Sequence, residues 1–374
     1  MKASVYLCMG LTILSLSLHA TPPGKIWKIR KYLDDATAQG LTGVSVYVRT
    51  KDGREWTATS GYSNIRTKTP MKKDDIFSLA SIGKMYNAVA VLKLMEEGRI
   101  KLDDKMSQYL SDEIVTNLPN GNDITIKHLL AQTTGYVNYE HDPQLLKLYF
   151  SDALNLDTLS RTNALRRYVF GKPALFTPGE RYDYSSTNYL LLALIVDKIV
   201  PEGHSEYLRK LLKQHGYLNT SYRQEPESNA ISYYGDMDQN GVVDDLTRET
   251  IETTNWLEGD DGVYAPVEEV AHFLEDLMHG KILNEASLKL MQTWNNDKSP
   301  DYGLGLMADK SFPYSFLMGH SGRGVAVTTD AYYFPKQDMT VVILCNTGLR
   351  EAAPKFKKAY LKMRTRIVKK LFLF

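Results

Sequence analysis

Strand patterns lie at both ends of this chain, and this arrangement constrains the fold more than any other feature. Residues 42–49 alternate valine with other side chains, a turn at 51–53 follows, and a second strand pattern covers 55–62, as in a β-hairpin. Near the other end, residues 325–334 precede an almost uninterrupted apolar run at 339–345, which predicts a strand buried on both faces. We therefore expect both ends of the chain to join one antiparallel sheet.

The stretch between these strand patterns has mostly helical apolar spacing. Helices are predicted there and at the two termini, over residues 26–38, 81–97, 126–132, 187–200, 205–215 and 356–374. The predicted fold is α/β (α+β): an antiparallel sheet flanked by N- and C-terminal helices, with a large, mostly helical insertion. We place the sheet lobe at about 24–77 and 262–374 and the helical lobe at about 78–261, with a functional site in the cleft between them.

The composition of the 374-residue chain is that of an ordinary soluble globular protein. Hydrophobic residues make up 43% and charged residues 24%, enough for a sizeable core. Lys and Arg number 45 against 44 Asp and Glu, so no charge excess attracts nucleic acid. We expect a monomer that does not bind nucleic acid.

The first twenty residues resemble a secretory signal. Lys2 is followed by an apolar run over 5–18, too short to span a bilayer comfortably, and by the small residue Ala20. We expect residues 1–20 to be a signal peptide and the domain at 21–374 to be periplasmic or secreted. An uncleaved anchor and a buried first helix are the alternatives. Without the leader, Cys345 is the only cysteine, so no internal disulfide is expected.

Ser81-Ile82-Gly83-Lys84 is the only Ser-x-x-Lys sequence in the chain, and it opens a predicted helix. A three-residue step places Ser81 and Lys84 on one helix face, which also carries the apolar stripe. We expect burial to lower the proton affinity of Lys84, so that it can act as a base toward the Ser81 hydroxyl. The helix N-terminus would add N–H groups that stabilise an oxyanion. The alternative is a serine N-cap followed by an ordinary surface lysine.

Two further motifs stand later in the chain. Tyr184 ends an extended piece after a Pro-Gly turn, where its side chain can project into a cleft. His320 lies in the only His-x-Gly sequence, and Gly322 would let a substrate backbone lie close against a strand. Taken alone, Tyr184 would be a half-buried aromatic residue and His320 a structural histidine.

Taken together and in this order, the three motifs resemble those of the serine β-lactamase and penicillin-binding protein superfamily. They match Ser-x-x-Lys, Tyr-x-Asn, and the His-x-Gly variant of Lys-Thr-Gly. The branch indicated holds class C β-lactamases, D-alanyl-D-alanine carboxypeptidases and related esterases, and the resemblance covers nearly all of residues 30–350. Supporting stretches occur at 124–135, 176–189, 302–306 and 341–346.

This resemblance implies a serine hydrolase that works through an acyl-enzyme. Ser81 would attack a carbonyl, and Lys84 and Tyr184 would share the transfer of its proton to the leaving group. The backbone N–H groups of Ser81 and Arg323 would form the oxyanion hole. The substrate-binding residues implied are Ser186, His320, Ser321, Gly322 and Arg323. No cofactor or metal is implied, and the zinc-ligand spacing His-Glu-x-x-His is absent from the sequence.

Two departures from the family pattern narrow the expected substrate. Ser186 stands where the family usually has Asn, and a hydroxyl cannot supply two amide donors. His320 replaces Lys and removes a fixed positive charge; Arg323 either restores that charge for a substrate carboxylate or faces solvent. We therefore expect a D-alanyl carboxypeptidase or small esterase, acting on a small molecule or a peptide such as a peptidoglycan fragment, with poor β-lactam hydrolysis. A class C-like β-lactamase and a non-catalytic protein that binds a ligand or partner are the alternatives.

Residues 236–244 have two competing interpretations. They resemble the first nine positions of a calcium loop, but Thr247 stands where that loop has a bidentate Glu. Asn240-Gly241 between two apolar pairs is a strong hairpin signal, and we favour the hairpin.

The C-terminal helix carries a basic face opposite its apolar stripe. Such a face either stays in solvent while the stripe packs on a sheet, or lies on an anionic membrane. We expect residues 356–367 to pack on the sheet and residues 371–374 to make a weak, salt-sensitive contact with lipid.

Overall fold

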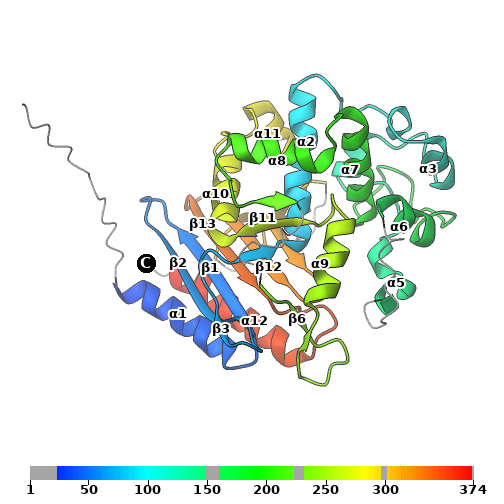
Figure 1. Cartoon of the computed structure of the whole chain (residues 1–374). Coiled ribbons are helices and arrows are strands. Elements are labelled where there is room, and N and C mark those ends of the chain that lie inside the picture. The colour runs from blue at the N-terminus through cyan, green and yellow to red at the C-terminus, as the bar shows by residue number, and fades with distance from the viewer. Residues whose placement is uncertain (1–22, 149–159, 223–230, 296–300, 313, 373–374) are drawn as a thin grey trace, which may run out of the picture.

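The strand patterns at the two ends of the chain meet in one sheet. The computed structural model describes residues 23–148, 160–222, 231–295, 301–312 and 314–372. β1 pairs with β13, with Val44 opposite Cys345, so the two ends are neighbours within the sheet. Eight strands of the described residues form this antiparallel sheet (Figure 1), in the order β3 (Thr69–Pro70), β2 (Glu55–Asn64), β1 (Gly43–Arg49), β13 (Met339–Cys345), β12 (Thr328–Phe334), β11 (Leu317–Arg323), β10 (Met307–Asp309) and β9 (Asp301–Tyr302). The predicted fold class is confirmed.

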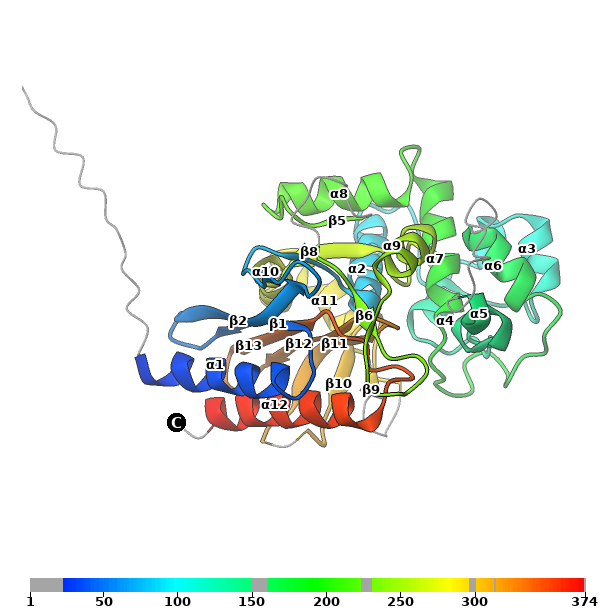
Figure 2. The same ribbon diagram turned by 60° about the horizontal axis from the view of Figure 1, so that its bottom comes forward.

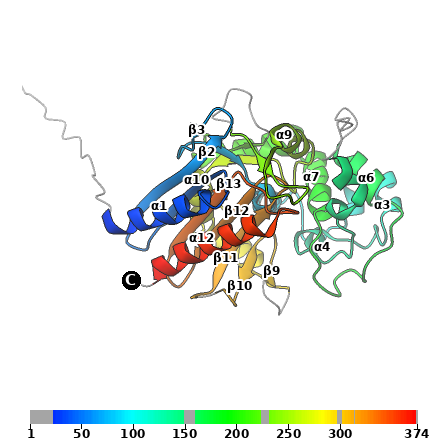
Figure 3. The ribbon, with the colours of Figure 1, turned by 90° about the horizontal axis from the view of Figure 1, so that it is seen from below.

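Two terminal helices cover one face of this sheet. α1 (Pro23–Thr37) and α12 (Pro354–Phe372) lie side by side on it (Figures 2 and 3). Helical spacing brings the apolar residues of each helix to the side that meets the strands. Their core partners are alternate residues of β1 and β13: Val44, Val46, Val48, Val341, Ile343 and Cys345.

The opposite face of the sheet is covered by α10 (Val267–Met278). Val342 and Leu344 of β13 join the core cluster on this side. Because both faces of β13 are covered, every residue of this strand is buried, which confirms the prediction from its apolar run. The sequence analysis did not identify α10, although its buried residues recur at helical spacing: Val267, Val270, Ala271, Leu274 and Leu277.

Most other helices gather above and to the right of the sheet in Figure 1. They are α2 (Gly83–Glu96), α3 (Asp112–Asn117), α4 (Ile126–Leu130), α5 (Pro143–Leu148), α6 (Arg161–Tyr168), α7 (Thr187–Ile199), α8 (His204–Gln214), α9 (Thr247–Trp256) and α11 (Glu285–Met291). Short 3₁₀ turns lie at η1 (Ala80–Ile82), η2 (Met106–Gln108) and η3 (Tyr139–His141). β8 (Val263–Pro266) pairs with β4 (Ile76–Ser78) and β5 (Ser221–Tyr222), and this small sheet lies beside the start of α2.

The 236–244 segment is a hairpin, as predicted. β6 (Tyr234–Gly235) and β7 (Asp244–Asp245) pair antiparallel. The Asp236 carboxylate accepts the Gly241 N–H at 3.1 Å and the Ala353 N–H at 3.1 Å. The Asp236 carboxylate therefore connects the hairpin to the segment before α12.

The predicted signal peptide, residues 1–20, lies outside the described residues. None of the helices in the described ranges combines the length and the apolar character needed to cross a membrane. Cys345 is buried in the sheet as a free thiol.

Candidate active site

Ser81 lies in a tight turn rather than in the first turn of a regular α-helix. The turn η1 precedes α2, and Ala80 has a positive φ of 48°, a conformation that costs a non-glycine residue roughly 1–3 kcal/mol. The Leu79 N–H bonds to β8 at 2.9 Å, and the Thr329 hydroxyl of β12 donates to the Leu79 carbonyl at 2.8 Å. Two strands thus hold the turn that carries Ser81.

Lys84 contacts Ser81 directly. Its side-chain nitrogen donates to the Ser81 Oγ and to the Asp260 backbone carbonyl, each at 3.0 Å. The Asp260 carboxylate lies 3.9 Å from the same nitrogen and accepts the Tyr139 hydroxyl at 2.6 Å. Lys84 and Asp260 are both fully buried. Lys84 is therefore aimed inward, and it is not a surface lysine.

The pKa of Lys84 shifts in the opposite direction to the one expected from the sequence. Burial alone lowers this pKa, but the interactions of Lys84 with Tyr184 and with the Asp260 carboxylate outweigh burial, and the net direction is upward. Burial also raises the pKa of Asp260 to about 7, although Lys84 opposes this rise. The resting site therefore holds Lys84 as an ammonium. Asp260 is a neighbouring group that titrates near neutral pH, and burial also raises the pKa of Asp261, to about 6.

Tyr184 lies beside the Ser81–Lys84 pair. The Lys84 nitrogen is 5.3 Å from the centroid of the Tyr184 ring. The Tyr184 hydroxyl is buried and has no hydrogen-bond partner of ordinary geometry among the described residues. Burial raises the pKa of this phenol, while the positive charge of Lys84 and the Ser81 hydroxyl lower it by less. Tyr184 is therefore a neutral phenol next to the Ser81 hydroxyl.

A cavity of about 420 Å³ lies beside Ser81 and Tyr184. Its walls come from segments that are far apart in the sequence. The lining residues are Ser81, Asn138, Glu140, His141, Tyr182, Tyr184, Met307, Ser321, Arg323 and Arg350. The Ser-x-x-Lys, tyrosine and glycine-containing motifs thus meet at one place.

Ser186 is not among the lining residues of this cavity, and its assignment as a substrate-binding residue stays a prediction. It is fully buried just before α7, where its N–H donates to the Asn138 side chain at 3.2 Å. Its hydroxyl has no hydrogen-bond partner in the described part of the chain. Asn138 lines the cavity in its place, and Asp260 supplies the contact with Lys84. The sequence analysis missed both residues because each lies far along the chain from the tyrosine motif.

His320 is buried behind the cavity wall and lines a smaller space of about 180 Å³. Its Nδ1 donates to the Ser321 carbonyl at 2.8 Å, and its Nε2 lies 3.3 Å from the Tyr302 hydroxyl. Burial lowers the pKa of His320 to about 3, so the ring is neutral at physiological pH. In this structure the His320 side chain is buried and Ser321 lines the cavity, so a direct contact of His320 with substrate stays a prediction.

Gly322 is required by a close approach between β11 and the Ser81 turn. A Cβ at position 322 would lie 2.7 Å from the Leu79 carbonyl oxygen and 2.8 Å from the Ala80 Cβ. These atoms belong to the protein, which corrects the expectation that this glycine makes room for a substrate backbone. The missing side chain instead allows β11 to pack against η1.

Gly322→Ala is expected to destabilise the fold by about 1–3 kcal/mol, because two of the atoms that meet the new methyl group belong to a rigid turn. Urea unfolding measures this loss. Gly83→Ala is the matched control, since its Cβ would meet only a valine side chain, at 3.3 Å, and ordinary contacts beyond it. Equal stability of the Gly322 variant and the wild type would show that the strand and turn can move apart freely.

Arg323 pairs with a carboxylate of the protein itself. Its guanidinium donates to the buried Asp330 carboxylate at 2.6 Å and to the Gly322 and Thr329 carbonyls, each at 2.7 Å. The Tyr360 hydroxyl of α12 donates to the same carboxylate at 2.8 Å. The charge of Arg323 is therefore paired with a buried carboxylate, while its side chain remains 36% exposed and lines the cavity.

The cavity also contains an ion pair that the sequence analysis missed. Arg350 donates to the Glu140 backbone carbonyl at 2.9 Å, and its other terminal nitrogen lies 3.6 Å from the Glu140 carboxylate. Both side chains remain partly exposed to the cavity. No local pattern signals the pair, because 210 residues separate its members in the sequence.

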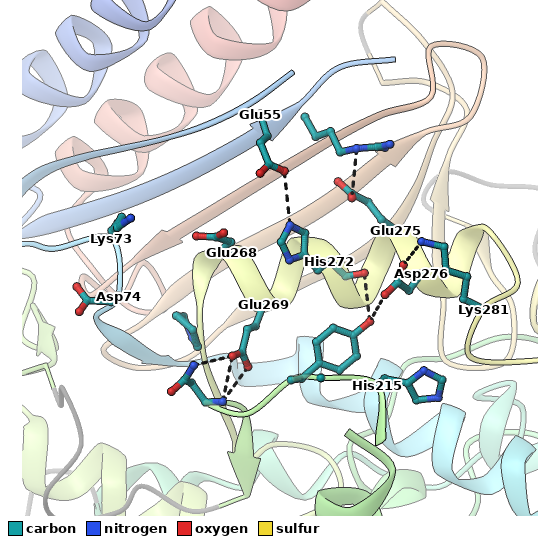
Figure 4. A pocket seen from close by; sticks show the side chains of 15 residues that line it. Glu55, Lys73, Asp74, His215, Glu268, Glu269, His272, Glu275, Asp276 and Lys281 are labelled. Atoms are coloured by element: carbon teal, nitrogen blue, oxygen red, sulfur yellow. Dashed lines mark hydrogen bonds and ion pairs between the residues drawn. The ribbon is translucent and has the colours of Figure 1, made fainter. Parts of the chain in front are cut away.

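A second cavity, of about 600 Å³, lies between β2 and α10 (Figure 4). Within the described part of the chain, one group of side chains has metal-ligand geometry, and it is here: Glu55, Glu268 and His272, with ligand atoms within 4.8 Å of one another. The Tyr47 hydroxyl donates to Glu55 at 2.6 Å and lies 3.2 Å from His272 Nε2. No serine or cysteine is among the lining residues of this cavity, whereas Ser81 lines the cavity described above.

The chain is similar to known proteins over most of its length. The sequence profile of the Beta-lactamase family matches residues 29–362. Penicillin-binding protein 4* of Bacillus subtilis is 24% identical over 331 residues, and protein flp of Staphylococcus aureus is 24% identical over 339 residues. These alignments cover 82% and 88% of this chain, but only 68% and 64% of the two relatives. The chain therefore spans about two thirds of their length.

Solved structures share the fold. D-amino acid amidase from Ochrobactrum anthropi superposes with a TM-score of 0.77 at 21% identity, covering 92% of this chain and 97% of that one. D-stereospecific amidohydrolase from Streptomyces sp. gives 0.75 at 23% identity, covering 89% and 98%. A penicillin binding protein from Bacillus halodurans gives 0.72 at 21% identity, covering 89% and 98%. With the family profile matched from residue 29 to residue 362, the chain belongs to the beta-lactamase family.

Proposed function

We propose that this protein is an exported serine hydrolase that cleaves an amide bond beside a D-amino acid, as in a D-alanyl peptide, through an acyl-enzyme on Ser81. One observation carries the proposal: the Ser81 hydroxyl accepts a 3.0 Å hydrogen bond from fully buried Lys84 at the wall of a 420 Å³ cavity. Two structural neighbours, a D-amino acid amidase and a D-stereospecific amidohydrolase, support the amide and its stereochemistry. The leader-like residues 1–20 support export.

The proposed reaction is acyl transfer in two halves. The Ser81 oxygen bonds to the substrate carbonyl carbon, the C–N bond breaks, and the leaving amine takes the proton that Ser81 gave up. Water then attacks the ester and releases the acid. β11 packs on η1. In the proposed reaction the N–H groups of Arg323 and Ser81 would stabilise the oxyanion, with each donor contributing roughly 3 kcal/mol.

Asp260 completes the proposed proton path. With Lys84 protonated and Tyr184 neutral at rest, the Ser81 proton needs an acceptor. The Asp260 carboxylate, 3.9 Å from the Lys84 nitrogen, can take a proton from Lys84 as Lys84 takes one from Ser81. Lys84 and Tyr184 then pass the proton to the leaving amine. Asp260 is a positioning and charge-balancing residue in this scheme, because it does not line the substrate cavity.

Asp260→Asn tests this assignment through the pH profile. Since the pKa of Asp260 is raised to about 7, its carboxylate predominates above that pH, and wild-type kcat/KM is expected to rise through about pH 7. The variant keeps the backbone carbonyl that binds Lys84 but loses the titrating group. We expect kcat/KM to fall at least roughly tenfold and the limb near pH 7 to disappear. If kcat/KM of the variant still rose near pH 7, the titrating group would not be Asp260.

The charges in the cavity suggest how substrates are selected. A substrate carboxylate can replace Glu140 beside Arg350, as a carboxypeptidase requires. A substrate ammonium can instead pair with Glu140, as an amidase of free D-amino acid amides requires. Because 3.6 Å separates the charged groups of Arg350 and Glu140, a substrate carboxylate or a substrate ammonium can replace one member of the pair.

A substrate series decides between these reactions. Purified protein is incubated with an N-acetylated D-Ala-D-Ala peptide, the same peptide with an amidated C-terminus, D-alaninamide, an aryl acetate and penicillin. Mass spectrometry reports the acyl adduct on Ser81 and its lifetime. We expect turnover of the first peptide and loss of activity when its carboxylate is amidated. Turnover of D-alaninamide alone would make the protein an amidase, and turnover of the ester alone an esterase. Rapid turnover of penicillin would support a β-lactamase, and no adduct with any compound would contradict the proposal.

A further inference from the structure

Positive charge is concentrated on two helices of this nearly neutral chain. α1 and α12 together contain twelve Lys and Arg residues and two Asp residues, a net charge of +10. The whole chain has a net charge of +1, so the remaining residues carry −9. A separation of this size produces a strongly positive surface wherever the two helices are exposed.

The two helices present this charge on one side of the molecule. They lie side by side on the same face of the sheet and form its outer layer (Figure 3). Both acidic residues already have partners: Asp35 accepts from Arg366 at 2.6 Å, and Asp34 accepts from the Ser60 hydroxyl at 2.6 Å. Among the residues whose side chains the structure describes, the exposed lysines of this outer layer are Lys28, Lys31, Lys355, Lys357, Lys358, Lys362 and Lys369.

Apolar groups accompany the lysines on this surface. Trp27 on the first turns of α1 is 63% exposed, and the Lys31 ammonium lies 5.8 Å from its ring centroid. Leu361 of α12 is exposed between lysines and lines an open groove of about 920 Å³. Lysines around an exposed tryptophan and leucine are the residues that bind an anionic bilayer at its interface.

The last residues of α12 pack differently from the lipid contact that the sequence predicted for residues 371–374. Leu371 is buried, and the Phe372 ring packs edge-on against Phe334 at 5.0 Å and stacks with Tyr314 at 5.9 Å. These two residues therefore belong to the sheet packing rather than to a tail that reaches lipid. Residues 373–374 lie outside the described residues.

We propose that the outer surface of α1 and α12 binds the surface of an anionic phospholipid bilayer. Each lysine close to such a surface strengthens binding roughly fivefold at low salt. The lysine ammonium groups pair with the lipid phosphates, while Trp27 and Leu361 enter the headgroup region. The neighbours of Ser81, Ala80 and Ile82, belong to a different core cluster from the buried residues of α1 and α12.

Co-sedimentation with vesicles tests this proposal. The full chain is mixed with vesicles of phosphatidylcholine and phosphatidylglycerol, or of phosphatidylcholine alone. One variant changes five outer lysines to Gln: Lys28, Lys31, Lys357, Lys358 and Lys362. The matched control changes five exposed lysines elsewhere: Lys68, Lys101, Lys127, Lys213 and Lys289.

We expect the wild type and the control to bind only the anionic vesicles, and to be released in about 1 M salt, where the Debye length is about 3 Å. The outer-lysine variant should bind at least roughly a hundredfold more weakly. Its unfolding midpoint should match that of the control. No binding by the wild type, equal loss in the two variants, or binding to soluble polyphosphate but not to vesicles would overturn the proposal.

Trp27 fluorescence provides a second, independent measurement. Entry of an indole into the headgroup region shifts its emission to shorter wavelength. We expect anionic vesicles to cause this shift in the wild type and not in Trp27→Phe, which keeps the other three tryptophans of the chain. An equal shift in Trp27→Phe would overturn the assignment of this face.

Discussion

Ser81→Ala is expected to abolish hydrolysis, lowering kcat/KM by roughly 10⁴-fold or more. The variant removes the Ser81 oxygen, which accepts a hydrogen bond from Lys84 at the cavity wall. It should also abolish labelling by a serine-directed phosphonate. The fold should survive, because Lys84 keeps its 3.0 Å hydrogen bond to the Asp260 carbonyl. Steady-state kinetics and mass spectrometry of labelled peptides measure the two effects.

Ser321→Ala is the matched control for that experiment, since Ser321 lines the same cavity without contacting Lys84. This variant should still be labelled at Ser81. A labelled peptide from the wild type that maps to Ser321, or to any serine other than Ser81, would contradict the proposed nucleophile.

Lys84→Ala and Lys84→Arg are both expected to lower kcat/KM by at least about 100-fold. Alanine removes the hydrogen bond to Ser81 and leaves Asp260 without its counter-ion. Arginine keeps the positive charge but stays protonated at neutral pH, so it cannot accept and return a proton. Comparing the two variants therefore distinguishes a role of Lys84 in proton transfer from a role in supplying positive charge.

Lys84 is fully buried, so folding must be checked in both variants. Circular dichroism and the urea midpoint serve this purpose. Lys84→Met, which keeps most of the buried volume, is a third variant for the case in which the other two unfold. An arginine variant that is folded and retains more than about a tenth of the wild-type rate would show that Lys84 only supplies charge.

Much of the fold could be predicted from the sequence because its signals are local. Valine alternation over 42–49 and the apolar run at 339–345 each report the burial of a strand. The stripes of the terminal helices report which side packs on the sheet. Helix α10 was missed even though its spacing is just as local, because the 262–374 segment was interpreted mainly through its strands.

The Ser81–Lys84 contact could also be predicted, because one helical turn joins the two residues. The direction in which the Lys84 pKa shifts could not be predicted from the sequence. Burial follows from the apolar stripe, but the opposing effects come from Tyr184 and Asp260, which are 100 and 176 positions farther along the chain. Charges from remote segments decide such shifts.

The sequence by itself determined the central strands of the sheet, the terminal helices and the Ser81–Lys84 contact, since each depends on residues a few positions apart. Only the tertiary structure decided which side chains surround Ser81. It buried Ser186, paired Arg323 with Asp330, and brought Asp260 to Lys84. These outcomes depend on packing between segments that are far apart in the sequence. The close approach of β11 to the Ser81 turn at Gly322 is one example, and it leaves no periodic signal in the sequence.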